Sequence, residues 1–499
     1  MDGRRHRLIV VSNRLPLVFR RNGGDHWLAE SGSGGLVSAL LPVLRNRGGT
    51  WIGWTGTSES GPGLDAALAR AGEEAGYALR SVPLSAEEVH DFYLGFSNEI
   101  IWPLFHDMVS LCNFEPAYWQ AYREVNRKFA QVIMESNGHE NDFVWVHDYH
   151  LMNVAAELRE LGCGARTGFF LHIPFPPPDL FIKMPWCAQV IQALLCYDLV
   201  GFQTARDRRN FVQCVRALDR GVEIEGRGQM VTARTGNRTV RIGAFPISID
   251  FDTFVREATA GDVAAKVGEL RGLLPDRKLV LGIDRLDYTK GIPQRLRAFH
   301  LLLQRHPELR EKVTLIQVVV PSRIDIPSYG ELKTTIEQLV ARINGEFMRP
   351  GGWVPIWYVY GSLTRLELLA YYRAADIALV TPLKDGMNLV AKEYCASSIE
   401  SDCVLVLSKF AGAAAELGEG ALLVNPYDLE GTADALHLAC AMDPNERRAR
   451  MRRMRHSIRR HDIYHWVNTF MAAAFAADLR EFPLPDHPLA EGLGGVPAL

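Results

Sequence analysis

Short runs of β-branched residues alternate with stretches of helical spacing along most of the 499 residues. In the first half these strand-like runs are 7–12, 50–56, 142–148, 166–173 and 198–203. In the second half they are 278–284, 312–321, 354–361, 377–383, 403–410 and 421–426. Such alternation predicts parallel sheets covered by helices on both faces. We therefore expect an α/β protein with doubly wound, Rossmann-like domains, plus a hairpin at 226–245, where glycines and alternating β-branched residues occur.

A break in the alternation at 245–252 separates two series of strands. Because a chain of this length exceeds what one hydrophobic core usually covers, we expect two domains of similar size. The predicted domains are an N-terminal one at 1–246 and a C-terminal one at 247–463, facing each other across a cleft. We expect a helix at 464–480 that packs back on the N-terminal domain, and a loose Pro/Gly-rich tail at 481–499. The cleft is the expected binding site.

Composition excludes two classes of partner. The formal net charge of −3 argues against a general nucleic-acid or membrane-surface binder. No apolar run approaches the ~20 residues of a membrane helix, and the apolar run at 8–11 is too short for a signal peptide. The eight cysteines form no CxxC pair and no cluster at zinc spacing. We therefore expect reduced thiols in a cytoplasmic protein.

Residues 378–397, ALVTPLKDGMNLVAKEYCAS, place polar side chains where a buried strand meets a helix. The helix is expected to begin at Asn388, directly after the turn. Unpartnered N–H groups and the helix dipole make such a corner an anion site. Asp385 at its mouth and Glu393 inside the helix suit a sugar attached to a phosphate. The same pattern also fits a plain strand–helix corner with a capping Asp385 and a surface Glu393.

The sequence DRLDYTKG, at 284–291, ends another predicted strand. Arg285 and Lys290 stand five residues apart across a glycine turn, so that they can clamp a diphosphate. A surface network of charged side chains explains the pattern as well; the 378–397 corner in the same domain favours the phosphate interpretation. Arg323, after VVVPS, follows a later strand of this domain in the same way.

Five residues of the N-terminal domain follow predicted strands or lie in predicted loops: Arg14, Asp148, His172, Tyr93 and Trp102. A guanidinium, a carboxylate, an imidazole and two aromatic rings suit a sugar phosphate, since arginine binds phosphate and rings pack on pyranose faces. Taken singly, a histidine in the position of His172 is more often a core residue, and Trp102 also fits as a core residue. Only their shared position at strand ends favours a binding site.

A glycine-rich segment at 31–35 follows the first predicted strand and precedes a helical pattern at 36–44. It lacks the lysine of GxxxxGK[ST] and the full GxGxxG pattern. The segment indicates a nucleotide-type fold without implying a dinucleotide.

Nine motifs occur along residues 7–464: VVSNRLP, GGLVSAL, FSN..IWPLFH, VHDYHL, FFLHIPFP, DLVGFQT, DRLDYTKG, RINGE and TPLKDGMNLVAKEY. In this order they resemble the trehalose-6-phosphate synthase family, retaining glucosyltransferases of GT-B fold. The resemblance implies transfer of glucose from UDP-glucose to glucose 6-phosphate, giving trehalose 6-phosphate and UDP. It implies no cofactor.

The resemblance also implies roles for single residues. Donor-binding residues would be Gly34, Gly35, His172, Arg285, Lys290, Asp385, Asn388, Leu389, Val390 and Glu393. Among these, Arg285 and Lys290 would hold the diphosphate and Glu393 the ribose. Acceptor-binding residues would be Arg14, Trp54, Tyr93, Trp102, Asp148 and Arg323. The residues expected to take part in catalysis are Arg285, Lys290, Asp148 and His172.

Three departures from the family pattern concern selectivity: Lys384 stands in place of arginine, Leu94 follows Tyr93 in place of a polar residue, and PPPD occupies 176–179. They leave the nucleotide, UDP, GDP or ADP, open. Because no DxD motif lies near the donor residues, metal is expected to be dispensable. Three alternatives remain: a synthase that uses glycerol 3-phosphate, a non-catalytic sugar-phosphate sensor, and a pyridoxal phosphate phosphorylase, for which no cofactor lysine is identifiable. A homo-oligomer, dimer or tetramer, is expected.

Overall fold

The computed structural model describes residues 7–21, 27–31, 40, 44, 49–59, 61–136, 142–226, 228–323, 326–348 and 352–475. The chain divides into two compact units. Unit 1 comprises Met1–Ile247 and Tyr464–Leu499, and unit 2 comprises Ser248–Ile463. Among the described residues, no helix is both long and apolar enough to cross a bilayer.

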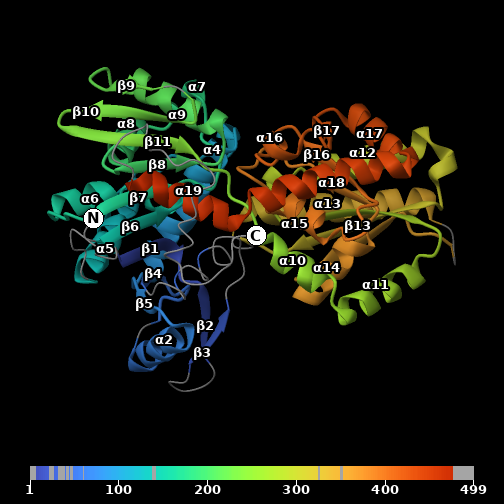
Figure 1. Ribbon diagram of the computed structural model, residues 1–499, viewed down its shortest axis with the longest axis horizontal. Coiled ribbons are helices and arrows are strands. Elements are labelled where there is room, and N and C mark those ends of the chain that lie inside the picture. Colours follow the sequence, from blue (N-terminus) through green and yellow to red (C-terminus); the bar gives the residue numbers. More distant parts are fainter. Residues whose placement is uncertain are drawn as a thin grey trace. The chain divides into compact units, whose positions relative to one another are not determined.

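Unit 1 is organised around a nine-stranded sheet in the order β5-β4-β1-β6-β7-β8-β11-β10-β9 (Figure 1). The parallel strands are β1 (Arg7–Arg14), β4 (Thr50–Trp54), β5 (Ala78–Ser81), β6 (Asp142–His147), β7 (Arg166–Phe170), β8 (Leu199–Phe202) and β11 (Arg238–Ala244). The antiparallel strands β9 (Glu223–Glu225) and β10 (Met230–Thr235) complete the edge, and β10 and β11 form the predicted hairpin. A separate ribbon pairs β2 (Leu17–Arg21) with β3 (Trp27–Ser31).

The helices of unit 1 follow from local signals in the sequence. They are α2 (Pro62–Ala75), α3 (Ala86–Glu88), η1 (Val89–Ile101), α4 (Trp102–Phe105), η2 (Val109–Leu111), α5 (Pro116–Glu135), η3 (Tyr149–Leu151), α6 (Val154–Glu160), α7 (Pro178–Phe181), α8 (Cys187–Leu194), α9 (Ala205–Leu218) and α19 (Ile463–Phe475). Ser85 and Glu88 form the capping box that opens α3. The helical stretch that follows it continues through the π-helix η1 and α4 to Phe105.

Helix α19 packs on the unit 1 sheet (Figure 1). The Phe470 ring stacks on Trp145 of β6, with centroids 4.5 Å apart. Gly168 and Gly201 make room for it, since an added Cβ would come within 3.1 Å and 2.7 Å of the Phe470 ring. This close packing holds α19, which follows unit 2 in the sequence, against the sheet of unit 1.

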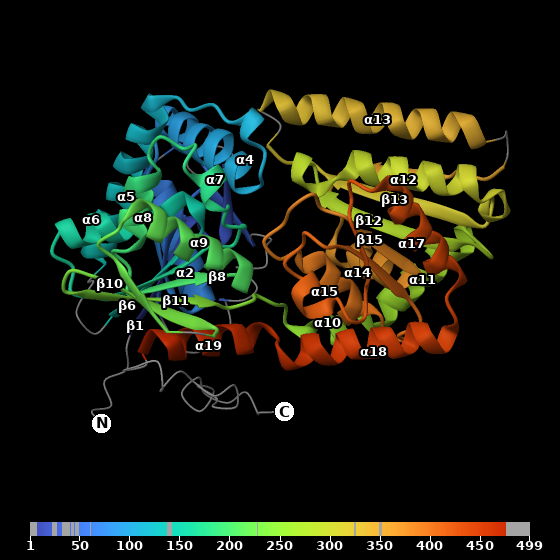
Figure 2. The ribbon, with the colours of Figure 1, turned by 90° about the horizontal axis from the view of Figure 1, so that it is seen from above.

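Unit 2 contains a parallel six-stranded sheet in the order β14-β13-β12-β15-β16-β17. The strands are β12 (Lys278–Arg285), β13 (Val313–Val320), β14 (Ile356–Tyr360), β15 (Ile377–Val380), β16 (Val404–Ser408) and β17 (Leu422–Val424). Its helices are α10 (Phe251–Ala258), α11 (Gly261–Leu273), η4 (Tyr288–Lys290), α12 (Ile292–Arg305), η5 (Pro307–Leu309), α13 (Pro327–Phe347), α14 (Arg365–Ala374), α15 (Leu389–Ser397), α16 (Ala414–Leu417), α17 (Leu429–Ala441) and α18 (Pro444–Arg460). Figure 2 shows α12 and α13 on one face of the sheet and α14 and α15 on the other.

Both units are therefore doubly wound, and the predicted α/β fold class is confirmed. The central strands are buried on both faces, as in β1, where six of the eight residues are buried. Burial on both faces explains why these strands consist of nearly continuous apolar runs.

Candidate active site

Two strands of unit 2 that are distant in sequence end side by side. β12 and β15 are direct neighbours, with Val280 opposite Ile377. The strand order reverses between them, because β13 and β14 lie to one side and β16 and β17 to the other. Ligands of open α/β sheets bind beyond the carboxyl ends of the strands at such a point. The predicted residues Arg285, Lys290 and Asp385 all lie at or just after these two carboxyl ends.

Lys290 and Asp385 form an ion pair across 95 residues of sequence. Lys290 Nζ donates to Asp385 Oδ2 at 2.6 Å, and the two side chains are 13% and 14% exposed. The carboxylate also accepts from Asn388 Nδ2 at 3.1 Å and from the Met387 N–H at 3.3 Å. Since an ammonium carries three N–H donors, Lys290 can hold Asp385 and still donate to a phosphate.

Arg285 is the last residue of β12 and its side chain is exposed. Within the described part of the chain it has no hydrogen bond or ion pair. Its charge acts on nearby Asp287: burial alone would raise the pKa of this carboxyl, but Arg323, Lys290 and Arg285 together hold it below its usual value. The Arg285 guanidinium is thus available to an anionic ligand.

The N-terminus of α15 lies directly after Asp385. Asn388, with φ 74° and ψ 83°, is its N-cap, and its side chain accepts from the Ala391 N–H at 3.4 Å. Leu389 and Val390 are the first two helical residues, so their N–H groups have no carbonyl partner within the helix. With the positive end of the helix dipole, these amides give the corner beside Lys290 and Asp385 the N–H donors that an anion site requires.

Glu393 is half-buried one turn into α15 rather than on an open surface. Tyr372 of α14 donates its hydroxyl to Glu393 Oε2 at 2.7 Å. Burial raises the pKa of Glu393, while Tyr372 and Arg365 oppose the rise. Tyr372 was not predicted as a site residue, since its only signal is a position in an ordinary helical pattern.

Arg323, a predicted acceptor ligand, belongs to unit 2 and is already paired. Its Nη1 donates to the Tyr329 hydroxyl at 2.7 Å and to Asp287 Oδ2 at 3.3 Å, and its side chain is 8% exposed. Its φ of 48° lies in the left-handed region. The guanidinium therefore fixes the segment after β13, and an acceptor would have to share it with Asp287.

A buried ion pair supports the carboxyl ends of the unit 2 strands. Arg295 Nη1 donates to Asp284 Oδ2 at 2.6 Å, and Arg295 Nε donates to Thr381 Oγ1 at 3.1 Å. Gly282 leaves space for it, since a Cβ there would meet Arg295 Nη1 at 2.6 Å. The pair ties β12 to the segment after β15 and was missed from the sequence, where Arg295 stands in an amphipathic helix like many surface arginines.

Three predicted acceptor residues of unit 1 converge. The Arg14 guanidinium lies 4.7 Å from the Trp54 ring centroid and 5.4 Å from that of Tyr93, and the two rings are 6.0 Å apart. Arg14 ends β1, Trp54 ends β4 and Tyr93 lies in η1. They form an exposed cation between two aromatic faces, an arrangement that suits a phosphorylated sugar.

Tyr93 and Trp102 do not lie in loops, so that prediction was wrong. Tyr93 is in the π-helix η1 and Trp102 begins α4. The Trp102 ring is 5% exposed and packs on His106 and Tyr149. Trp102 is connected to the Arg14 group through Tyr149 and His150, and the His150 ring stacks on Tyr93. The π-helix was not foreseen because its apolar spacing resembles that of an α-helix.

Asp148 follows β6 in a backbone conformation that residues other than glycine rarely adopt. Its φ is 74° and its ψ is 166°. Its N–H donates to the Phe170 carbonyl at 2.8 Å, and its Oδ1 accepts from the His172 N–H at 3.3 Å. Such strain costs about 1–3 kcal/mol and gathers at functional sites. The strain therefore marks Asp148 as a candidate functional residue, whose carboxylate is held in place at a cost to the folding stability.

We expect the Asp148→Gly variant to be more stable than Asp148→Ala by about 1–3 kcal/mol, because only glycine adopts this φ and ψ without strain. Both variants lose the carboxylate, so their difference isolates the backbone. Urea unfolding midpoints measure it, and turnover should fall in both variants. Equal midpoints would show that the strain is absent in solution.

The imidazoles of His147, which is buried, and His172, which is half-buried, lie close together. His147 Nδ1 lies 3.2 Å from His172 Nε2. Burial lowers the pKa of His172 to about 3, and burial followed by the charge of His172 lowers the pKa of His147 well below its usual value. Both rings are therefore neutral near pH 7, and His172 would act as a hydrogen-bonding group. His147 was not predicted, although its place in VHDYH beside Asp148 was a signal.

The lowered pKa values of these two imidazoles make the free energy of unfolding depend on pH. Below pH 6.5 the two imidazoles bind protons in the unfolded chain but stay neutral in the folded chain. The free energy of unfolding therefore falls as the pH drops from 6.5 toward the pKa values of the folded state. We expect His147→Phe to reduce this slope by up to about 1.4 kcal/mol per pH unit. Urea unfolding at pH 7, 6 and 5 measures the slope, with the exposed His456→Phe as control. A slope equal to that of the unaltered chain would contradict the burial of His147.

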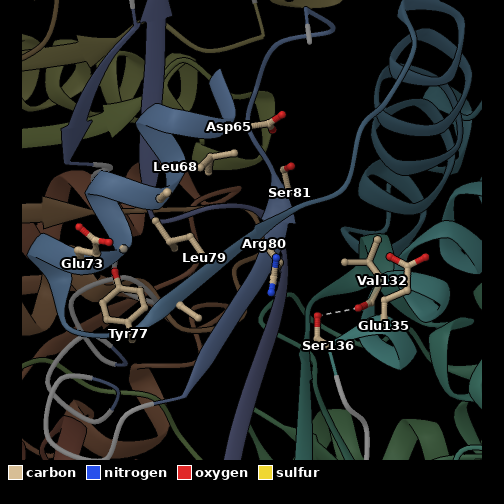
Figure 3. Close-up of a pocket in the computed structure, with 13 residues that line it drawn as sticks. Asp65, Leu68, Glu73, Tyr77, Leu79, Arg80, Ser81, Val132, Glu135 and Ser136 are labelled. Carbon is tan, nitrogen blue, oxygen red and sulfur yellow. Dashed lines mark hydrogen bonds between the residues drawn. The ribbon is translucent and has the colours of Figure 1, made fainter. Parts of the chain in front are cut away.

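A separate cavity of about 630 Å³ lies among α2, β5 and the end of α5 (Figure 3). Its lining includes Asp65, Glu73, Arg80 and Glu135, and none of the predicted site residues. Gly34 and Gly35, predicted near the donor, lie outside the described residues. Each unit therefore has its own candidate site: the strand ends of unit 2, and in unit 1 the groups around Arg14 and Asp148.

The family model of glycosyltransferase family 20 matches residues 6–475. The chain belongs to glycosyltransferase family 20. It is 43% identical over 472 residues to a trehalose-6-phosphate synthase of Mycolicibacterium gilvum, with 93% of each chain covered. The predicted family and enzyme class, a glycosyltransferase, are confirmed.

Solved structures of this family match along nearly the whole chain. The trehalose-phosphate synthase (UDP-forming) of Burkholderia xenovorans, in complex with glucose 6-phosphate, is 36% identical with a TM-score of 0.84, covering 94% of this chain and 100% of that one. An Escherichia coli structure bound with UDP-2-fluoro glucose is 35% identical with a TM-score of 0.82, covering 94% and 98%. Family membership thus rests on both sequence and fold.

Proposed function

We propose that this family 20 enzyme transfers glucose from UDP-glucose to glucose 6-phosphate with retention of configuration, giving trehalose 6-phosphate and UDP. The observation that carries the proposal is the cluster of Arg285, Lys290 and Asp385 with the α15 N-terminus at the unit 2 strand ends. Relatives that match more than nine-tenths of this chain are named as trehalose-phosphate synthases, and these names support the proposal.

In this proposal unit 2 binds the donor. Arg285, Lys290 and the Leu389 and Val390 amides hold the diphosphate, since each presents N–H donors to an anion. Asp385, oriented by Lys290 and Asn388, accepts from glucose hydroxyls. The Glu393 carboxylate holds the ribose, and Tyr372 fixes it for that role.

Unit 1 residues bind the acceptor. Arg14 binds the phosphate of glucose 6-phosphate, and Trp54 and Tyr93 flank it. Asp148 accepts from the attacking sugar, and His172 donates to a glucose hydroxyl. Arg323 and Trp102 stay in the proposal as acceptor residues with weaker support, because Asp287 and the aromatic core already engage them. Gly34 and Gly35 remain proposed donor-loop residues.

The chemistry follows from charge. Breaking the glucosyl–phosphate bond leaves a cationic sugar and an anionic diphosphate, and Arg285, Lys290 and the α15 amides stabilise that anion. Asp148 Oδ1 accepts from the His172 N–H, and the sequence shows no two-carboxylate layout of the hydrolase kind, so we assign no carboxylate as a nucleophile. The acceptor hydroxyl therefore attacks from the face that the leaving group vacates. Its proton passes to the departing phosphate oxygen.

The test uses the untagged full-length chain with a panel of donors and acceptors. UDP release and the anomeric configuration of the product are measured, with UDP-, GDP- and ADP-glucose against glucose 6-phosphate and glycerol 3-phosphate. We expect turnover with UDP-glucose and glucose 6-phosphate, an α,α-linked product, and unchanged turnover in chelator. Preference for glycerol 3-phosphate would support the alternative acceptor, and no turnover with any pair would support a sensor.

Two further properties stay proposals. Eight free cysteines suit a reducing, cytoplasmic environment. A homo-oligomer, dimer or tetramer, is proposed from the sequence, and light scattering during gel filtration measures the mass that decides it.

A further inference from the structure

Helix α12 packs against α17 (Figure 2). Two histidines and a glutamate lie close together just after the end of α12 and on α17. His306 follows α12, Glu308 lies in η5 and His437 lies on α17. Glu308 Oε1 is 3.1 Å from His306 Nδ1 and 3.7 Å from His437 Nε2. One ligand atom from each residue lies within 4.8 Å of the other two. All three are atom types that bind transition metals.

The separations match those around a metal ion. Ligands placed tetrahedrally at 2.0–2.1 Å from zinc are about 3.3 Å apart. The two distances to Glu308 lie on either side of this value. The imidazole rings are stacked, with centroids 3.8 Å apart and planes 8° apart, so one ring must turn for both lone pairs to meet one ion. Both rings are half-buried and Glu308 is exposed, so a water molecule can supply a fourth ligand.

The surrounding charges are compatible with a cation. Arg305, next to His306, is paired with Glu430 at 2.9 Å and Asp434 at 3.6 Å, both on α17. A metal ion would therefore meet one carboxylate and two imidazoles, with the nearby arginine already compensated.

The cluster lies at the opposite end of the sheet from the donor residues. α12 begins after the carboxyl end of β12, which carries Arg285, and runs back along the sheet. His306 and Glu308 therefore lie near the amino ends of the strands, shortly before β13 begins at Val313. A metal at this place cannot touch the donor phosphates.

We propose that His306, Glu308 and His437 bind one divalent transition-metal ion of borderline softness, such as zinc, which links α12 and η5 to α17. Two imidazoles and a carboxylate are a ligand set that favours zinc, nickel or copper over magnesium. Binding to the folded chain stabilises unit 2.

The test titrates the untagged full-length chain with zinc by calorimetry and follows thermal unfolding. We expect one ion per chain and a rise in the unfolding temperature. His437→Ala should weaken zinc binding by at least about 10-fold, the lower end of what even indirect partners of a metal contribute. His300→Ala is the matched control, because His300 of α12 pairs with Glu346 at 2.7 Å but belongs to no such three-residue group in the described chain.

A second readout uses Cu²⁺, whose electron paramagnetic resonance spectrum reports nitrogen ligands. We expect two imidazole nitrogens in the unaltered chain and in His300→Ala, and one in His437→Ala. Zinc affinity and copper spectra that are the same in the unaltered chain and His437→Ala would overturn the proposal, as would the lack of any bound ion.

Discussion

Replacing Arg285 with alanine is expected to lower kcat by about 10²–10³, the usual loss when one donor to a developing anion is removed. Arg285 is exposed at the end of β12 and has no ion pair among the described residues, so its charge is available to the leaving diphosphate. Since the interaction strengthens as the anion develops, the loss should appear in kcat more than in KM for UDP-glucose.

Arg453→Ala is the matched control for this prediction. Arg453 is an exposed arginine of the same unit, 64% exposed and 3.8 Å from Glu419, so its removal should leave kcat unchanged. Arg285→Lys should recover part of the loss because it restores the charge without the bidentate geometry. A kcat of Arg285→Ala within a few-fold of the unaltered enzyme would remove the leaving-group role from this residue.

Replacing Arg295 with methionine is expected to destabilise unit 2 by about 3–5 kcal/mol, since it leaves the buried Asp284 without its partner. The two side chains are 0% and 3% exposed, so water cannot take over the charge. Burial already raises the pKa of Asp284 against the opposing charge of Arg295, and the variant raises it further. The deficit should therefore be largest at neutral pH and shrink as the pH falls and Asp284 binds a proton.

The double variant Arg295→Met/Asp284→Asn is the control, because it removes both charges and should recover most of the lost stability. Urea unfolding gives the midpoints, and hydrogen exchange at the β12 amides localises the change to unit 2. If the single and double variants were equally unstable, the loss would come from packing and not from the unpaired carboxylate.

Much of the fold and part of the candidate site are readable from local patterns. Alternating apolar periods predict strands and helices because each period reflects the geometry of its own segment. DRLDYTKG and the 378–397 corner each carry cations or carboxylates at a strand end, so Arg285, Lys290 and Asp385 are identifiable from the amino-acid sequence alone. The capping box at Ser85 is readable for the same reason, since its two partners are three residues apart.

The amino-acid sequence by itself determined the α/β class, the two series of strands and the residue types at their ends, because these depend on neighbours a few positions away. Only the tertiary structure decided which ends meet. The Lys290–Asp385 pair exists because β15 lies beside β12, and the His147–His172 pair because β7 lies beside β6. The engagement of Arg323 by Asp287 and the burial of Arg295 arise in the same way. Strand order and side-chain burial depend on the packing of the whole domain, and no local period encodes them.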